Sequence, residues 1–111
     1  MEIQTRREGN AAVVSVRGRL DAVTAEDYRN AVRVLVETGT TRVVVDLRDL
    51  DYISSSGMSA LVLTTRWLKE KDGRLGVASL RESIHSVIRM CGIEKLLEIY
   101  ASVPEAVAEF T

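Results

Sequence analysis

The sequence predicts an α/β fold in which a small mixed β-sheet carries about four helices. Segments rich in β-branched residues alternate with segments whose apolar residues recur at helical spacing. Gly, Asn and Asp residues stand between these segments, where turns are expected. The length of 111 residues is ordinary for one domain, so we expect a single domain over residues 1–111.

Two strand candidates open the chain, over residues 2–7 and 11–17. Gly9 and Asn10 stand between them and suit a hairpin turn, so the two strands are expected to pair antiparallel. A loop is predicted over residues 18–22.

A helix is predicted after this loop. Thr24 is followed by Asp27 three residues later, which is typical of a capping box, and Val23 is expected to form a hydrophobic staple with Tyr28. The apolar residues of the helix share one face, and they are Tyr28, Ala31, Val32, Leu35 and Val36. Gly39 is expected to end the helix in a left-handed conformation.

The centre of the chain predicts a parallel crossover. Residues 42–46 are mostly apolar and β-branched, which is typical of a strand buried on both faces. A turn is predicted over residues 51–58, followed by a helix and then, after a break at 71–73, by a strand over 74–78. The apolar residues of that helix recur at i, i+3, i+4, i+7 and i+10, and they are Met58, Leu61, Val62, Thr65 and Leu68.

A third helix is predicted after Ser83, and Gly92 is expected to cap its end. Its apolar stripe consists of Ile84, Val87, Ile88 and Cys91. Because Cys91 lies on this stripe, we predict a buried structural thiol rather than a nucleophile.

The last helix is predicted to begin at a second capping box, formed by Ser102 and Glu105 with Pro104 in the first turn. The segment before it, residues 93–100, is ambiguous, and a short strand over 98–100 is one interpretation.

Three consecutive serines, Ser54, Ser55 and Ser56, stand at the predicted start of the second helix. Unpaired backbone N–H groups and the positive end of the helix dipole favour negative charge there, including a phosphate. Serines at a helix start commonly serve only as N-caps, but a phosphate can take over the same N–H contacts. Three serines exceed what capping requires, so we expect function to reside in this turn.

The order of elements, together with three motifs, resembles the STAS domain family and in particular bacterial anti-sigma factor antagonists. The motifs are Gly-Arg-Leu-Asp at 18–21, Val-Val-Val-Asp-Leu at 43–47 and Tyr-Ile-Ser-Ser-Ser-Gly-Met at 52–58. In that family a strand leads into an Asp-Ser-Ser/Thr-Gly turn, and a partner phosphorylates the first serine after the acidic position. The resemblance implies that this serine is Ser55, with Ser56 as second choice, while Ser54 occupies the place of the acidic residue.

The resemblance also implies a partner-switching mechanism. The unmodified domain binds an anti-sigma factor that is also a serine kinase and so releases a sigma factor, phosphorylation breaks the complex, and a metal-dependent serine phosphatase resets it. The implied partner-binding residues are Asp21, Ser54, Ser55, Ser56, Gly57 and Met58. Ser54 in place of an acid keeps an alternative open, in which the domain is a non-phosphorylated interaction subunit of a transporter or sensory complex.

Three residues near these motifs have competing interpretations. Asp21 is either a partner contact or a solvated turn aspartate ahead of the first helix. Asp46 is expected to hydrogen-bond the loop that follows the central strand. Arg19 is a weaker interface candidate.

Composition and motifs argue against other functions. A formal net charge of -1 provides no basic field for nucleic acid, and the apolar runs fall far below the ~20 residues of a membrane helix. A single cysteine and no apparent leader favour a cytoplasmic location. His85 is the only histidine, and neither a nucleophile elbow nor a phosphate-binding loop is present, so we expect no catalysis, metal or cofactor.

Overall fold

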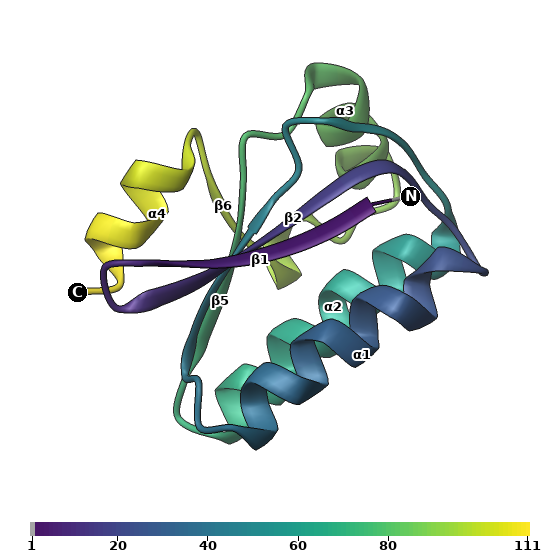
Figure 1. The fold of residues 1–111 in the computed structure, drawn as a ribbon. Helices are drawn as coiled ribbons and strands as arrows, with labels where there is room; N and C mark the ends of the chain where they lie inside the picture. The colour runs from purple at the N-terminus through teal and green to yellow at the C-terminus, as the bar shows by residue number, and fades with distance from the viewer. Residues whose placement is uncertain (1) are drawn as a thin grey trace.

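The computed structural model describes residues 2–111, in which strands and helices alternate along the chain (Figure 1). The strands are β1 (Glu2–Glu8), β2 (Ala11–Leu20), β3 (Arg42–Asp46), β4 (Leu50–Ile53), β5 (Arg74–Ala78) and β6 (Glu98–Tyr100). The helices are α1 (Thr24–Glu37), α2 (Ser55–Glu70), α3 (Glu82–Met90), the short 3-10 helix η1 (Glu94–Leu96) and α4 (Val103–Glu109).

The strands form one mixed sheet in the order β1-β2-β3-β5-β6. β1 pairs antiparallel with β2, and the remaining neighbours pair in parallel. The predicted hairpin and the predicted parallel pairing of β3 with β5 are therefore confirmed. β4 lies off this path and pairs in parallel with the last residues of β2.

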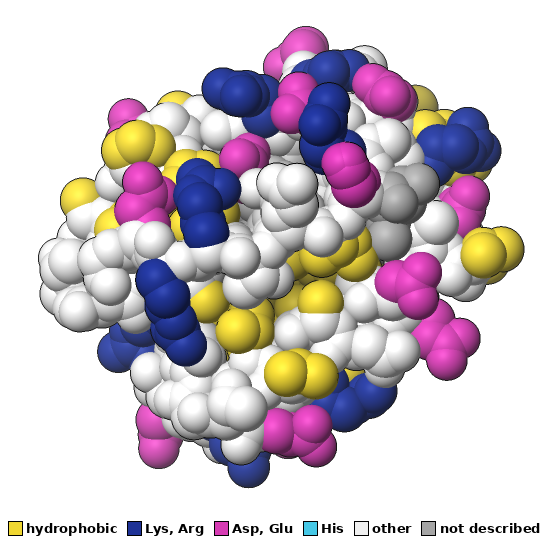
Figure 2. Space-filling model, viewed as in Figure 1, with side chains coloured by type: hydrophobic (Ala, Val, Ile, Leu, Met, Phe, Trp, Pro, Cys, Tyr) yellow, Lys and Arg dark blue, Asp and Glu magenta, His cyan; other side chains and the backbone are white. Residues whose placement is uncertain are grey.

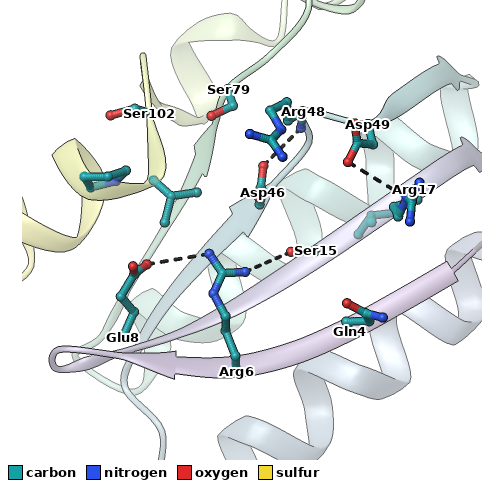
Figure 3. A pocket seen from close by; sticks show the side chains of 13 residues that line it. Gln4, Arg6, Glu8, Ser15, Arg17, Asp46, Arg48, Asp49, Ser79 and Ser102 are labelled. Atoms are coloured by element: carbon teal, nitrogen blue, oxygen red, sulfur yellow. Dashed lines mark hydrogen bonds and ion pairs between the residues drawn. The ribbon is translucent and has the colours of Figure 1, made fainter.

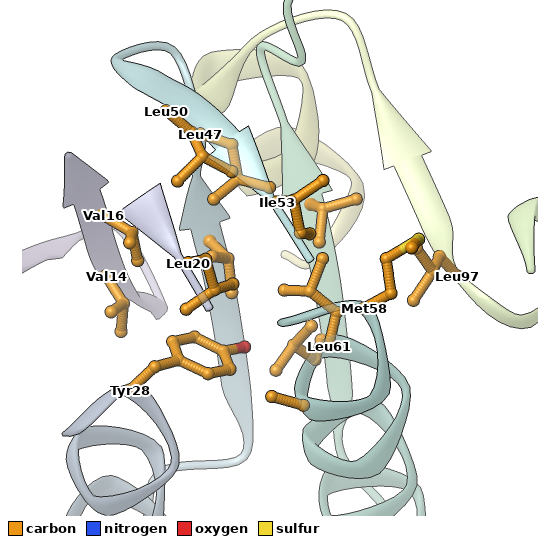
Figure 4. Close-up of a cluster of buried hydrophobic side chains, with 14 of the residues drawn as sticks. Val14, Val16, Leu20, Tyr28, Leu47, Leu50, Ile53, Met58, Leu61 and Leu97 are labelled. Atoms are coloured by element: carbon orange, nitrogen blue, oxygen red, sulfur yellow. The ribbon is translucent and has the colours of Figure 1, made fainter. Parts of the chain in front are cut away.

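Helices cover both faces of the sheet. Figure 1 shows α1 and α2 side by side on one face, and α4 on the opposite face. The central strand confirms its predicted burial on both faces, because Val43 and Val45 join the larger core while Val44 joins the smaller core beneath α4. Figure 4 shows Tyr28 reaching from α1 into the larger core.

The predicted turn over residues 51–58 and the predicted loop over 18–22 are both partly wrong. β4 occupies the first half of the turn, and β2 extends to Leu20. The two segments stabilise each other, since Leu20 pairs with Ile53 and both side chains are buried. Local sequence does not reveal this pair, because the burial pattern of β4 is inward, outward, outward, inward rather than alternating.

The helix α1 begins at Thr24, as predicted, but its predicted cap and staple are wrong. The capping residue is Asp21 rather than Thr24: Asp21 Oδ1 accepts hydrogen bonds from the backbone N–H groups of Val23 and Thr24, each at 3.1 Å. Thr24 Oγ1 returns a bond by accepting from Asp21 N at 2.9 Å. Val23 forms no staple, because its side chain is 81% exposed while that of Tyr28 is fully buried.

Cys91 is exposed, which contradicts the predicted buried thiol. The helical repeat would place Cys91 on the stripe of Ile84 and Ile88, but α3 ends at Met90 and Cys91 lies at its C-cap. The chain leaves the core there, because Gly92 adopts a positive φ of 75°. Gly39 likewise ends α1 with a φ of 96°, as predicted.

The ambiguous segment 93–100 forms η1 and then β6. The predicted cap of α4 is confirmed, since Ser102 Oγ accepts from Glu105 N at 3.2 Å. Among the helices of residues 2–111, none combines the length and the apolar composition needed to cross a membrane.

Candidate functional site

Ser54 fixes the turn that joins β4 to α2. Its backbone is extended (φ −95°, ψ 175°), and its hydroxyl accepts a hydrogen bond from Gly57 N at 3.2 Å. Its own backbone N–H donates to the Leu20 carbonyl at 3.0 Å. Ser54 is therefore the N-cap of α2, and it also ties the start of that helix to the end of β2.

Ser55 is the first residue of α2, and its side chain is exposed, whereas Ser54 and Ser56 are half-buried. The first turn of α2 contains no acidic residue, so no carboxylate offsets its unpaired N–H groups. The first turn of α1, by contrast, carries Glu26 and Asp27. Figure 1 shows that the two helices begin at the same end of the molecule, so two positive dipole ends lie near each other and only that of α1 is offset.

Gly57 and Met58 lie beneath the surface of the turn. A Cβ atom on Gly57 would stand 2.3 Å from the Leu20 carbonyl oxygen, so only glycine permits this approach of helix and strand. Met58 is 7% exposed and belongs to the larger core, where Figure 4 shows it pointing toward Leu97. Both residues support the serine turn from below and present little surface of their own.

Asp21 lies next to the serine turn, because the Leu20 carbonyl before it accepts from Ser54 N. The pKa of its carboxyl is below the usual value, chiefly because the backbone N–H of Thr24 donates to it. The carboxylate thus caps α1 while remaining partly accessible. The resemblance to the family implied that Asp21 and the serines share one site, and in the structure their adjacency depends on the pairing of β2 with β4.

Sequence reasoning missed a cation–π contact beside Asp21. Arg19 pairs in register with Tyr52, and its guanidinium carbon lies 4.2 Å from the centroid of the Tyr52 ring. Arg19 Nε also stands 3.6 Å from Asp21 Oδ2. No local signal predicts the contact, because it arises only when the ends of β2 and β4 pair.

The segment before β4 is fixed by ionic and polar contacts. Asp46 Oδ1 accepts from Arg48 N at 3.1 Å, which confirms the role predicted for Asp46. Arg81, directly before α3, bonds Asp51 at 2.5 Å and the Arg48 carbonyl at 2.8 Å. The approach to the serine turn is thereby held from the side of α3.

A polar hollow of about 520 Å³ lies on the α4 side of the sheet (Figure 3). Its side chains bond mainly to one another: Arg6 donates to Ser15 and lies 3.7 Å from Glu8. His85 bonds Glu94 at 2.5 Å and takes part in no serine–histidine arrangement in residues 2–111. In the same range, no group of His, Cys, Asp or Glu is placed to hold a metal ion.

The charges on the surface are mixed. Figure 2 shows acidic and basic side chains interspersed over the face that it presents, without a broad area of one sign. The fold and the site together define a small α/β domain with an exposed serine at the start of α2.

The chain belongs to the STAS domain family, whose model matches residues 2–106. Among curated relatives, BtrV of Bordetella bronchiseptica is 29% identical over 98 residues, which span 88% of this chain and 84% of that protein. The anti-sigma F factor antagonist of Paenibacillus polymyxa is 25% identical and covers 98% of this chain and 96% of its own length. Relatives of this type are named anti-sigma factor antagonists, which are non-enzymatic regulatory proteins.

Solved structures have the same fold. An anti-sigma factor antagonist from Mycobacterium paratuberculosis superposes with a TM-score of 0.88 at 25% identity, covering 98% of this chain and 92% of that chain. SpoIIAA from Bacillus, solved in a phosphorylated form, superposes with a TM-score of 0.75 at 20% identity over 99% of this chain and 100% of that chain. The predicted α/β architecture, a mixed sheet with four α-helices, is confirmed.

Proposed function

We propose that this protein is an anti-sigma factor antagonist that acts by partner switching. The unphosphorylated form binds an anti-sigma factor with serine kinase activity, and so frees a sigma factor. Phosphorylation of Ser55 ends that complex, and a serine phosphatase restores the binding form. The observation that carries the proposal is the division of roles in the turn, where Ser55 alone among the three serines is exposed.

Ser54 and Ser56 are less suitable acceptors. The Ser54 hydroxyl is half-buried and engaged as the N-cap of α2, so it is less accessible to a kinase than the exposed Ser55 hydroxyl. Ser56 is half-buried and remains the second choice. Ser55 needs no rearrangement of the helix start before its hydroxyl can enter a kinase active site.

The serine at position 54 preserves the structural part of the family motif. Serine and aspartate are about equally good N-caps, so Ser54 replaces the acidic residue as a cap while leaving out its charge. The start of α2 then carries no side-chain anion until Ser55 is modified. The absence of that charge also favours the alternative of a non-phosphorylated interaction subunit, which the experiment below separates from the switch.

A phosphate on Ser55 acts on binding more than on folding. It adds about −1.5 to −2 charges and three acceptor oxygens at pH 7. The N-terminal end of α2 tolerates that charge, because its N–H groups and dipole favour anions. Within a close-packed interface the same charge is costly unless the partner supplies cations. The modification therefore separates the partners and leaves the fold intact.

The proposal is tested by mapping phosphorylation. Candidate anti-sigma kinases from the source genome are incubated with ATP and wild-type protein, Ser55→Ala, Ser56→Ala or Ser59→Ala. Ser59 is the matched control, since it is an exposed serine one turn further along α2. We expect stoichiometric phosphate on wild type, Ser56→Ala and Ser59→Ala, and none on Ser55→Ala. A kinase that binds the protein tightly but transfers no phosphate to residues 54–56 would instead favour the constitutive subunit.

A further inference from the structure

Two large apolar side chains beside the serine turn are exposed to solvent instead of packing in the core. Tyr52, two residues before Ser54, is 42% exposed, and Val23, at the start of α1, is 81% exposed. Both adjoin the predicted site: Tyr52 pairs with Arg19 of β2, and the backbone N–H of Val23 bonds Asp21. A single exposed apolar residue is common on a protein surface. Here two of them adjoin one turn, and one of them is stacked against an arginine.

The Tyr52 ring is held in place before any partner arrives. The Arg19 guanidinium stacks over it, and Asp21 stands 3.6 Å from Arg19 Nε. A cation–π contact of this kind orders two long side chains in the free protein. Binding then costs less conformational entropy at these two residues.

Arg19 retains capacity for a further contact. Within residues 2–111, no hydrogen bond or ion pair engages its two terminal nitrogens, and its side chain is 62% exposed. A guanidinium with free donors recognises a carboxylate well, because it can present two parallel N–H groups. Tyrosine and arginine are also among the residue types most enriched where a few side chains dominate the affinity of an interface.

We propose that the stacked pair Arg19 and Tyr52, together with Val23, forms the affinity anchor for the anti-sigma partner. The partner fitted to this anchor is a protein with an apolar pocket for Tyr52 and Val23, and with an acidic side chain at the rim facing Arg19. This inference rests on the proposed function and adds the residues that select the partner.

The anchor also explains the effect of the switch. Ser55 follows Tyr52 by three residues, and the backbone N–H of the preceding Ser54 bonds the carbonyl of Leu20, the residue after Arg19. A phosphate there brings negative charge next to the partner's acidic rim, so like-charge repulsion acts where Arg19 had attracted that rim. Phosphorylation thus weakens the same contact that gives the unmodified form its affinity.

Two exposed valines provide a matched test. The probe is the recombinant anti-sigma kinase that phosphorylates the wild-type protein in the mapping experiment, with ADP bound to prevent phosphate transfer. Val23→Ser is compared with Val34→Ser, since Val34 is also exposed, at 57%, but lies near the far end of α1. We expect Val23→Ser to raise Kd about tenfold, as for loss of a buried valine, and Val34→Ser to leave Kd unchanged.

The tyrosine provides a second comparison. Tyr52→Ala is expected to raise Kd roughly 30-fold, whereas Tyr52→Phe keeps the ring and stays within a factor of about three. Arg19→Glu is expected to weaken binding and to reduce its dependence on salt concentration. Urea unfolding of each variant shows that the fold is retained.

The outcomes separate this inference from the proposed function. If folded Tyr52→Ala and Val23→Ser bind the kinase as tightly as wild type, the anchor lies elsewhere, while the switch at Ser55 stands. If no kinase binds or phosphorylates the wild-type protein, the proposed function itself fails. Selective loss in the Val23 and Tyr52 variants, with Val34→Ser unaffected, supports the anchor.

Discussion

The serine turn distributes distinct tasks among adjacent residues. The Ser54 hydroxyl accepts a hydrogen bond from the backbone of Gly57, whereas Ser55 is exposed. Gly57 allows the helix to approach the Leu20 carbonyl closely. The three serines therefore differ in their surroundings although their side chains are identical. Because the side chains are identical, the position of each serine in the turn decides which hydroxyl is accessible.

Gly57→Ala is expected to destabilise the protein and to displace the serine turn. The added Cβ would meet backbone at 2.3 Å, and a backbone carbonyl cannot move aside as a side chain can. Overpacking of this kind typically costs about 1–3 kcal/mol, which urea unfolding measures. Gly76→Ala is the matched control, because its Cβ would meet the Tyr100 side chain at 2.7 Å and lies away from the turn.

The two glycine variants should differ in function as well as in stability. Gly57→Ala should also slow phosphorylation of Ser55 under conditions in which the protein is still folded, whereas Gly76→Ala should lose stability alone. Normal stability and normal phosphorylation of Gly57→Ala would contradict the close approach of α2 to β2.

Asp21 gives the protein a predictable response to acid. Its folded-state pKa lies below the ordinary value of 3.8, chiefly because the backbone N–H of Thr24 donates to the carboxylate. A carboxyl with a lowered folded pKa contributes stability above its unfolded pKa, and that contribution is lost as the pH falls through the folded value. The loss attributable to Asp21 therefore begins near pH 4 and continues below it.

Asp21→Asn keeps a capping acceptor but does not titrate. We expect the melting temperature of Asp21→Asn to fall less steeply than that of wild type between pH 5 and pH 2.5, as followed by circular dichroism. Asp72→Asn serves as control, because Asp72 is exposed and lies in the turn that follows α2. If the melting temperatures of wild type and Asp21→Asn fell in parallel with pH, the capping bonds would not favour the charged carboxylate over a neutral acceptor.

At the scale of elements, α1 and α2 are joined by a polar contact inside the larger core. The Tyr28 hydroxyl and Thr64 Oγ1 lie 2.8 Å apart, and both side chains are fully buried. Thr64 Oγ1 also donates to the Ala60 carbonyl at 2.9 Å, so the Tyr28 hydroxyl is the donor between the two side chains. Burial, the dominant cause, raises the pKa of Tyr28, which keeps the phenol protonated.

Removing the Tyr28 hydroxyl and removing the Thr64 hydroxyl should reduce the stability of the protein by different amounts. Tyr28→Phe leaves Thr64 bonded to Ala60, so we expect a loss of about 1 kcal/mol. Thr64→Val leaves a buried Tyr28 hydroxyl without a partner, so we expect a larger loss, about 1–3 kcal/mol. Urea unfolding at pH 7 measures both values. An equal or reversed order would contradict the direction of the hydrogen bond.

Elements with a strong period were predictable from sequence, and pairings between distant segments were not. The second helix follows from the spacing of its apolar residues, and its cap from a serine at the right position. The cap of α1 was misassigned because both Asp21-x-x-Thr24 and Thr24-x-x-Asp27 fit a capping pattern, and only the path of the chain leaving β2 selects the first. Cys91 was misplaced because the helical period was extended one residue past the end of α3.

In the candidate site, too, local features were predictable from sequence and contacts between distant segments were not. The serine turn is a local feature, so sequence located it, and the resemblance to the family supplied Asp21 as its neighbour. The stack of Arg19 on Tyr52 requires the register between β2 and β4, which has no local signature. The exposure of Val23 likewise depends on how the chain enters α1.

At the scale of the whole molecule, the sheet separates the site from the far face. α1, α2 and α3 pack on the larger core beneath the serine turn, while α4 packs on the smaller core. The far end of the sheet is fixed independently: Arg74 bonds Glu98 at 2.6 Å and Tyr100 at 3.1 Å. Burial and the bond to Glu98 raise the pKa of Tyr100 to about 12. These contacts do not involve the serine turn, so a local charge there can change binding without requiring a change of fold.

The most direct test of the switch is a calorimetric titration of the ADP-bound anti-sigma kinase with the unmodified protein and with protein fully phosphorylated on Ser55. We expect tight binding of the unmodified protein and of unphosphorylated Ser55→Ala, and at least about 100-fold weaker binding of the phosphorylated form, as when an uncompensated charge enters an interface. Equal affinity of the two forms for the kinase would contradict the switch and would leave the protein as a constitutive interaction subunit.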